Sequence, residues 1–356
     1  MAAVDCGTLI IGGFDGTSLP ERFARALSDG RRGGVIVFKR NLAGEPPQVA
    51  GLVRAIHAAA GEAPLVGIDQ EGGRVARIGA PLLEVPPMRT IASWGDVDFA
   101  ERIARTVGTE LAALGFTINF APVLDVNTRP DNPVIGDRAF SEDPVICARF
   151  GAAWTRGLQD AGLLACGKHF PGHGGSSKDS HFELPVVDRA RDDLERVDLA
   201  PFRAAIEAGV ASWMTAHVVY PALDAALPAT LSRSVCTVLR DRLGFAGMLI
   251  SDDLEMRAIA ARWPIEEAAV QAIDAGCDAL LICSSDESQE RAVEALTRRA
   301  EASSGFRARC EQARARVLHA RRRATARPLD SDAIARVVGG EQARDVAREI
   351  ARRLGR

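Results

Sequence analysis

Eight short apolar segments, rich in β-branched and aromatic residues, recur along the chain and predict strands. They are residues 8–16, 34–41, 64–73, 116–127, 162–174, 211–221, 247–256 and 279–285. Each ends in glycine or polar residues, which is typical of a buried strand that runs into a loop. Between most of them, apolar residues recur at i, i+3 and i+4 and predict helices, several of which end at glycine. The clearest are residues 46–61, 98–115, 194–209 and 264–276.

This alternation of strands and helices indicates a parallel sheet, because parallel neighbours need a crossover connection. Eight units predict an α/β fold of the (β/α)8 TIM-barrel type. The alternative is an open doubly wound sheet, but no G-x-G-x-x-G motif opens the first predicted helix. We expect residues 1–300 to form the barrel. Residues 301–356 are expected to form C-terminal helices that pack on the barrel or trail from it.

Composition and charge exclude several classes of protein. The net charge is −3, and the arginines of residues 322–356 alternate with acidic residues, so no nucleic-acid partner is expected. No basic segment precedes the first apolar run, and no apolar run approaches about 18 residues, which argues against a signal peptide and a membrane partner. The seven cysteines are odd in number and form no C-x-x-C pair, so neither disulfides nor a thiolate zinc site is expected. A cytoplasmic monomer is therefore predicted.

Polar residues cluster where the predicted strands end, and reacting groups of a barrel come from those ends. They are Asp69, Gln70, Glu71, Arg74, Asp125, Asn127, Asp137, Arg138, Lys168, His169, His217, Ser251, Asp252 and Asp253. Charged groups at buried strand ends cost free energy unless they are paired or used, so they indicate a polar pocket for a polar ligand. Glu71 and Arg74 fit either a structural ion pair below this pocket or two ligands. Asp125 and Asn127 are expected to hold neighbouring strand ends together.

Three histidines, His169, His173 and His181, lie in the glycine-rich segment 167–185. A metal site is one interpretation, but Pro171 and the glycine after it prevent the helical i, i+4 arrangement that zinc ligands often use. The sequence therefore argues against a metal site in this segment.

The triplet Asp179-Ser180-His181 supports a second interpretation, because alternate residues of an extended segment face the same way. A carboxylate beside an imidazole raises the pKa of the imidazole and fixes its tautomer, which suits a proton donor. A loop hydrogen bond with no chemistry is the alternative.

Asp252 and Asp253 end the seventh predicted strand. Their side chains should face opposite ways, so we expect only one of them to react. A carboxylate nucleophile opposite a separate proton donor is the arrangement of a retaining glycosidase. The usual donor is a second carboxylic acid, whereas the candidate here is a histidine.

The ordered motifs of the chain resemble one known family. They are GFDGT, DQEGGRVARI, FAPVLDVN, NPVIGDRAFSEDP, KHFPGHG, DSH, MTAHVVYPALD, PATLS and SDDLEM, between residue 13 and about residue 256. Together they resemble the bacterial β-N-acetylhexosaminidases of glycoside hydrolase family 3, in the single-domain form that recycles cell wall. The resemblance implies that Asp252 is the nucleophile, and that His181 is the general acid and base, oriented by Asp179. It implies that Asp69, Arg77, Arg138, Lys168 and His169 bind sugar hydroxyls, and that His217 and Met214 line the pocket.

The resemblance also implies an activity that needs no cofactor. It is a retaining exo-β-N-acetylglucosaminidase that releases terminal β-linked N-acetylglucosamine from small carbohydrates, muropeptides above all. Chitooligosaccharides and glycosylated surface proteins remain open as substrates. A histidine base is uncharged and repels an anionic acceptor less than glutamate does, so a phosphorylase that uses phosphate is an alternative. An inactive sugar-binding barrel and a metal-dependent hydrolase are further alternatives.

Overall fold

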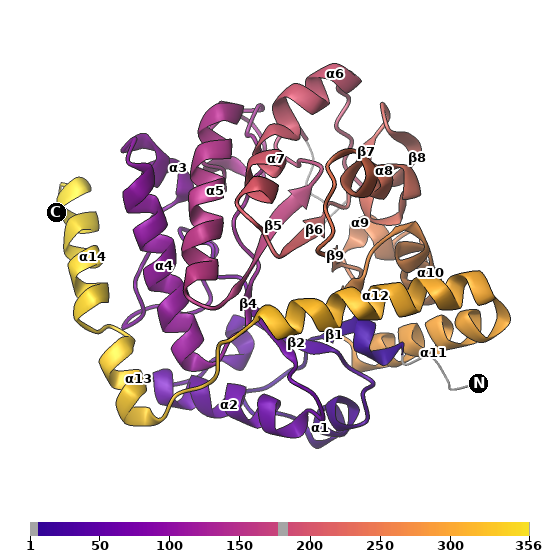
Figure 1. The fold of residues 1–356 in the computed structure, drawn as a ribbon, viewed down its shortest axis with the longest axis horizontal. Helices are drawn as coiled ribbons and strands as arrows, with labels where there is room; N and C mark the ends of the chain where they lie inside the picture. Colours follow the sequence, from indigo (N-terminus) through magenta and orange to yellow (C-terminus); the bar gives the residue numbers. More distant parts are fainter. Residues whose placement is uncertain (1–5, 177–183, 356) are drawn as a thin grey trace.

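The chain folds into a closed barrel of eight parallel strands. The computed structural model describes residues 6–176 and 184–355. Around the barrel the strands follow the order β1-β10-β9-β6-β5-β4-β3-β2, with every neighbouring pair parallel (Figure 1). They are β1 (Ile10–Gly12), β2 (Gly34–Val37), β3 (Leu65–Ile68), β4 (Ile118–Asn119), β5 (Leu164–Phe170), β6 (Ser212–Thr215), β9 (Met248–Asp253) and β10 (Ala279–Ile282). The closed sheet confirms the predicted TIM barrel and rules out the open doubly wound sheet.

Helices surround the barrel and connect its strands. They are α1 (Glu21–Ser28), α2 (Pro46–Ala59), α3 (Met88–Ser93), α4 (Val97–Leu114), α5 (Pro144–Asp160), α6 (Arg191–Asp193), α7 (Ala200–Glu207), α8 (Arg233–Thr237), α9 (Arg257–Ala260), α10 (Ile265–Ala275) and α11 (Asp286–Ala302). The helix signals of the sequence are confirmed in α2, α4, α7 and α10. In α4, the Asp96 carboxylate accepts a hydrogen bond from the Phe99 amide, and Gly115 ends the helix at φ 94°.

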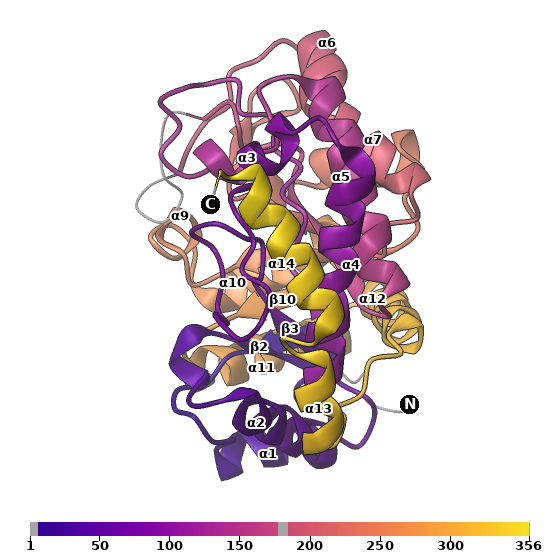
Figure 2. The same cartoon turned by 90° about the vertical axis from the view of Figure 1, so that its left-hand side faces the viewer.

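Three further helices follow α11 and pack on the barrel. They are α12 (Ser304–Arg323), α13 (Ser331–Val337) and α14 (Glu341–Arg353). Helix α12 crosses the amino-terminal end of the barrel beside α10 and α11, while α13 and α14 run along α4 (Figures 1 and 2). Buried Glu110 of α4 accepts hydrogen bonds from the amides of Leu83 and Gly339, at 2.9 and 2.8 Å. This carboxylate ties the C-terminal segment to the loop that follows β3.

The carboxyl ends of the strands carry the polar residues singled out by the sequence. Strand β5 continues to Phe170, so Lys168 and His169 belong to the strand and the long loop begins after them. A small antiparallel hairpin, β7 (Val219–Tyr220) and β8 (Asp224–Pro228), follows β6 at the same end. In the described part of the chain, no helix combines the length and apolarity that crossing a membrane requires.

Candidate active site

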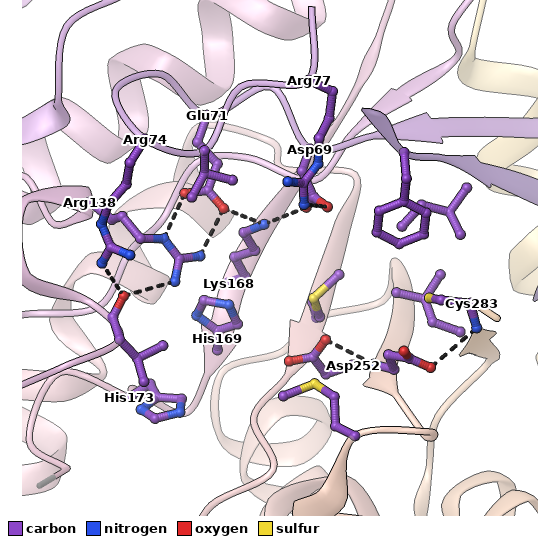
Figure 3. A pocket seen from close by; sticks show the side chains of 18 of the residues that line it. Asp69, Glu71, Arg74, Arg77, Arg138, Lys168, His169, His173, Asp252 and Cys283 are labelled. Carbon is purple, nitrogen blue, oxygen red and sulfur yellow. Dashed lines mark hydrogen bonds and ion pairs between the residues drawn. The ribbon is translucent and has the colours of Figure 1, made fainter. Parts of the chain in front are cut away.

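A cavity of about 450 Å³ opens at the carboxyl ends of the barrel strands. Its walls come from strands β2, β5, β6, β9 and β10, and from the loops after β2, β3 and β4 (Figure 3). Seven of the residues that the family resemblance assigns to the site line it, namely Asp69, Arg77, Arg138, Lys168, His169, Met214 and Asp252. The cavity has the size of an ordinary small-molecule site.

One wall of the cavity is a network of ion pairs centred on Lys168. The Lys168 ammonium lies 2.8 Å from an Asp69 oxygen and 2.6 Å from a Glu71 oxygen. Arg138 binds both oxygens of Glu71, each at 2.8 Å, and Arg77 Nη2 donates to the second Asp69 oxygen at 2.9 Å. Figure 3 shows this chain of alternating charges along one side of the cavity. Each buried charge therefore has a partner, as burial requires.

These contacts control the protonation of the two carboxylates. Burial alone would raise the pKa of Asp69, but Lys168 and Arg77 outweigh it and hold that pKa below its usual value. Burial likewise opposes ionisation of Glu71, yet Arg138 and Lys168 bring its pKa far below the ordinary range. Both groups are therefore charged at neutral pH, and both are hydrogen-bond acceptors.

His169 stands beside this wall and is oriented by Asp125. Its Nδ1 lies 2.7 Å from an Asp125 oxygen. Burial would raise the pKa of Asp125, but the neighbouring His169 and His173 lower it below its usual value. An ionised Asp125 only accepts hydrogen bonds, so it keeps the proton of a neutral His169 on Nδ1 and leaves Nε2 as the acceptor nitrogen.

Asp125 also fixes the start of the loop after β5. It accepts hydrogen bonds from the amides of His169 and His173, the latter at 2.6 Å. The link expected of Asp125 and Asn127 is therefore present for Asp125, which also orients the His169 ring. His173 Nδ1 lies 2.9 Å from the Ser176 hydroxyl, and burial with the nearby His169 lowers the pKa of His173 to about 4. A neutral His173 at neutral pH follows.

The opposite wall is formed by the end of β9. The Asp253 amide donates to Asp252 Oδ1 at 2.8 Å, and within the described residues this is the one hydrogen bond to the Asp252 carboxylate. Figure 3 shows Asp252 across the cavity from Lys168 and Arg138. Asp252 thus combines an ionisable oxygen with few competing contacts, which is what a nucleophile needs.

Asp252 and Asp253 both border the cavity, and their carboxylates make different contacts. Strand β10 pairs Ala279 with Ile250 but Leu281 with Asp253, so two residues of β10 oppose three of β9. Such a bulge changes the direction of the following side chains. Asp253 accepts hydrogen bonds from the amides of Glu255 and Cys283, at 3.1 and 3.2 Å, and burial raises its pKa to about 7.

His217 is placed differently from its predicted position. It is fully buried and is not among the residues that line the cavity. Its Nε2 donates to the carbonyl oxygen of Asp253 at 2.8 Å, and its Nδ1 lies 2.7 Å from the Thr230 hydroxyl. His217 therefore supports the strand end that carries the carboxylates, because both ring nitrogens are held within the protein. Asp179 and His181 lie outside the described residues.

Two further features of the site differ from or add to the sequence interpretation. Glu71 pairs with Arg138 and Lys168. Arg74 instead pairs with Asp137 at 3.2 Å. The interpretation of Glu71 and Arg74 as an ion pair with each other is therefore wrong. Phe38 and Arg40 also line the cavity, from the loop after β2. The polar residues at the end of the second predicted strand, residues 34–41, could have indicated that Phe38 and Arg40 belong to the site.

Among the described residues, no group of three or more His, Cys, Asp or Glu side chains has the arrangement to hold a metal ion.

Comparisons with known proteins place the chain in a family. The profile of the glycosyl hydrolase family 3 N-terminal domain matches residues 13–320. A β-hexosaminidase of Thiobacillus denitrificans is 46% identical over 279 residues, which are 76% of this chain and 77% of that protein.

Solved structures of family 3 enzymes are also similar to this chain. A family 3 β-N-acetylglucosaminidase from Paenibacillus sp. superposes with a TM-score of 0.87 at 39% identity, covering 98% of this chain and 69% of that one. NagZ from Neisseria gonorrhoeae superposes with a TM-score of 0.81 at 31% identity, over 97% of both chains, and a structure of it with N-trifluoroacetyl-D-glucosamine is also a match. The predicted resemblance is therefore confirmed. The chain belongs to glycosyl hydrolase family 3 and is a glycoside hydrolase.

Proposed function

We propose that the protein is a retaining exo-β-N-acetylglucosaminidase. The observation that carries this proposal is the position of Asp252, a carboxylate with one hydrogen bond among the described residues that faces a wall of charged hydrogen-bonding groups across the cavity. That arrangement lets the wall hold a sugar ring while the carboxylate reaches its anomeric carbon. The names of relatives support the choice of sugar, because they include β-hexosaminidases and a β-N-acetylglucosaminidase.

In the proposed reaction, Asp252 attacks the anomeric carbon while His181 gives a proton to the departing glycosidic oxygen. The bond to the aglycone breaks and an ester to Asp252 forms. A water molecule, deprotonated by His181, then displaces Asp252 and regenerates the carboxylate, with retained β configuration. The role of His181, with Asp179 as its orienting partner, rests on the D-S-H sequence and on the family resemblance.

The charged wall is proposed to bind the terminal sugar. Lys168 and Arg138 offer donors to sugar hydroxyls, while the ionised carboxylate of Asp69 accepts from them. Arg77 and His169 extend this set, and Met214 supplies an apolar contact. The charged groups and His169 are held in place by contacts within the protein, which reduces the entropy that binding would otherwise cost. The proposed steps need no metal or organic cofactor.

The proposed substrate is a small carbohydrate, a muropeptide with terminal N-acetylglucosamine, as in peptidoglycan recycling. This part of the proposal rests on the family resemblance and on the likeness to NagZ. A monomer in the cytoplasm, with no nucleic-acid or membrane partner, belongs to the same proposal.

Hydrolysis of 4-nitrophenyl N-acetyl-β-glucosaminide tests the proposal, with nuclear magnetic resonance to identify the first anomer released. Release of the β anomer that is independent of phosphate, persists with EDTA and is lost in Asp252→Ala and His181→Ala supports a retaining hydrolase. Release that requires phosphate identifies a phosphorylase, and loss with EDTA identifies a metal-dependent enzyme. The absence of release by folded protein, with retained binding of N-acetylglucosamine, indicates a sugar-binding barrel.

A further inference from the structure

A second cavity lies at the opposite end of the barrel from the candidate active site. Its volume is about 540 Å³. It lies beneath the amino-terminal ends of β6 and β9, where Ala211 and Gly247 precede the strands, and α12 forms its other side. Apolar side chains including Ile206, Val210 and Phe245 line part of it. A cavity of this volume with mostly apolar walls and a few polar groups is typical of a small-molecule site.

The polar side chains of this cavity come from one face of α12, and three of the four are basic. Gln312, Arg316, His319 and Arg323 follow one another at intervals of four, three and four residues, so their side chains share a face of the helix. Arg323 Nη2 donates to the carbonyl oxygen of Gly209 at 3.1 Å, which fixes one end of this row. The residues that line the cavity include no Asp and no Glu among those that the structure describes.

Arg316 also belongs to a buried charge cluster behind the cavity. Asp278 is fully buried, and its carboxylate contacts three guanidinium groups, those of Arg240, Arg309 and Arg316. One carboxylate against three guanidinium groups leaves two positive charges without a counter-ion in the cluster. This excess of positive charge acts on Arg240. Burial lowers the pKa of its guanidinium, and repulsion from Arg316 and Arg309 lowers that pKa further. The cluster is therefore short of negative charge.

Arg316 is the member of the cluster that can reach a ligand. Within the described residues its guanidinium makes one hydrogen bond, the 3.2 Å contact from Nη1 to Asp278. A guanidinium carries further N–H donors in a flat fork that matches the oxygens of a phosphate or carboxylate. Arg309 is not a substitute, because it is bound to the carbonyls of Ile273, Gly276 and Cys277 as well as to Asp278.

We propose that the cavity under α12 binds a small organic oxyanion, whose phosphate or carboxylate head lies against Arg316, His319 and Arg323. The head would supply the negative charge that the Asp278 cluster lacks, and an uncharged or apolar body would lie along Ile206, Val210 and Phe245. The site is separate from the candidate active site and does not depend on the proposed function, because the two cavities lie at opposite ends of the barrel.

Thermal unfolding and isothermal titration with phenyl phosphate test this proposal, since phenyl phosphate joins an oxyanion head to an apolar ring. Sodium chloride at the same ionic strength is the reference. At phenyl phosphate near tenfold its Kd, we expect the Tm of the unaltered protein to rise by about 2 °C. The matched variants are Arg316→Gln and Arg322→Gln, since Arg322 lies on α12 but does not line the cavity.

Binding at least about tenfold weaker in Arg316→Gln, with unaltered binding in Arg322→Gln, supports the proposal. Without ligand at low salt, Arg316→Gln should unfold no earlier than the unaltered protein, because it removes one surplus charge. Should Arg316→Gln fail to fold, exposed Arg323→Gln replaces it, with the same weakened binding expected. An equal rise in Tm in all proteins, an equal effect of chloride, or no binding up to about 10 mM would overturn the proposal.

Discussion

The two walls of the candidate active site treat their carboxylates in opposite ways. The β3–β5 wall is the ion-pair network around Lys168, built from the loop after β3, the loop after β4 and strand β5. On this wall, Asp69 and Glu71 are each bound by two cationic side chains. On the β9 wall, Asp252 accepts one backbone hydrogen bond in the described part of the chain, and Asp253 is held by two backbone amides with no cation among the described residues. The carboxylates of the first wall are ionised and fixed, whereas burial raises the pKa of Asp253 to about 7.

This difference indicates a division of work between the walls. A carboxylate saturated by cations is a poor nucleophile, because bond formation would have to break its ion pairs, but it is a precise hydrogen-bond acceptor. A carboxylate with few partners is costly to bury yet free to react. The proposed roles follow this division, with recognition of the sugar on the β3–β5 wall and attack from the β9 wall.

Replacing Asp252, the proposed nucleophile, should have the largest effect. In Asp252→Gly, we expect kcat for 4-nitrophenyl N-acetyl-β-glucosaminide to fall by on the order of 10⁴- to 10⁶-fold, because no covalent intermediate forms. Added azide can enter the vacated space and attack the same face of the sugar, which would give the α-glycosyl azide. Steady-state rates and identification of that product check the prediction. Retained activity in this variant would remove Asp252 from the role of nucleophile.

The positions of such strand-end groups could be predicted from the sequence. Asp69, Lys168 and Asp252 each follow an apolar run, and a parallel barrel brings all carboxyl ends of its strands to one face. Their partners could not be predicted, because pairing depends on how the barrel closes. Glu71 and Arg138 are 67 residues apart, and Asp125 and His169 are 44 apart. The irregular register between β9 and β10, next to these two carboxylates, depends on how the strands pair and leaves no mark in the sequence.

The β3–β5 wall should respond to loss of its central cation by losing stability as well as activity. Lys168→Met leaves Asp69 and Glu71 with one cationic partner each, and we expect the free energy of unfolding to fall by about 3–5 kcal/mol. Urea unfolding measures this, with exposed Lys39→Met as the matched control.

The pH dependence of that loss follows from the lowered pKa values. Ion pairing of Asp69 and Glu71 stabilises the fold above their ordinary pKa values of 3.8 and 4.5, and this contribution disappears as pH falls through the lowered values. The stability of Lys168→Met and of the unaltered protein should therefore converge below about pH 4.5. A constant difference down to about pH 3 would contradict the assignment of Lys168 as their shared counter-ion.

His217 should affect the β9 wall alone. His217→Leu removes the hydrogen bond to the Asp253 carbonyl, so we expect kcat to fall by up to about 10²-fold through misplacement of Asp252. KM should stay unchanged, because the β3–β5 wall, which is proposed to bind the sugar, is intact. His57→Leu is the matched control, since His57 also donates to a backbone carbonyl, that of Gly115, far from the cavity. A raised KM in His217→Leu would instead support the sugar contact that the family resemblance implies.

The smallest effect on the reaction should come from Asp253, whose charge the proposed reaction does not use. The side-chain amide that Asp253→Asn introduces keeps an oxygen for the two backbone amides, so this variant should retain kcat within about threefold. Steady-state rates with 4-nitrophenyl N-acetyl-β-glucosaminide check this. A loss of activity as large as that in Asp252→Gly would give Asp253 a part in the chemistry and would end the division between the two neighbouring carboxylates.

The stability of Asp253→Asn should differ from that of the unaltered protein in its pH dependence. The pKa of Asp253 rises from 3.8 in the unfolded chain to about 7 in the fold, so its contribution is complete below pH 3.8 and is lost as pH rises through 7. Asp253→Asn has no such loss, and we expect its Tm at pH 8 to exceed that of the unaltered protein by at least about 2 °C. Glu110 and Asp198 also have raised pKa values, but both proteins share them, so the change in the Tm difference between pH 5 and pH 8 isolates Asp253. Equal pH slopes for the two proteins would mean that Asp253 is as well compensated as Asp69, and the contrast between the walls would then rest on Asp252 alone.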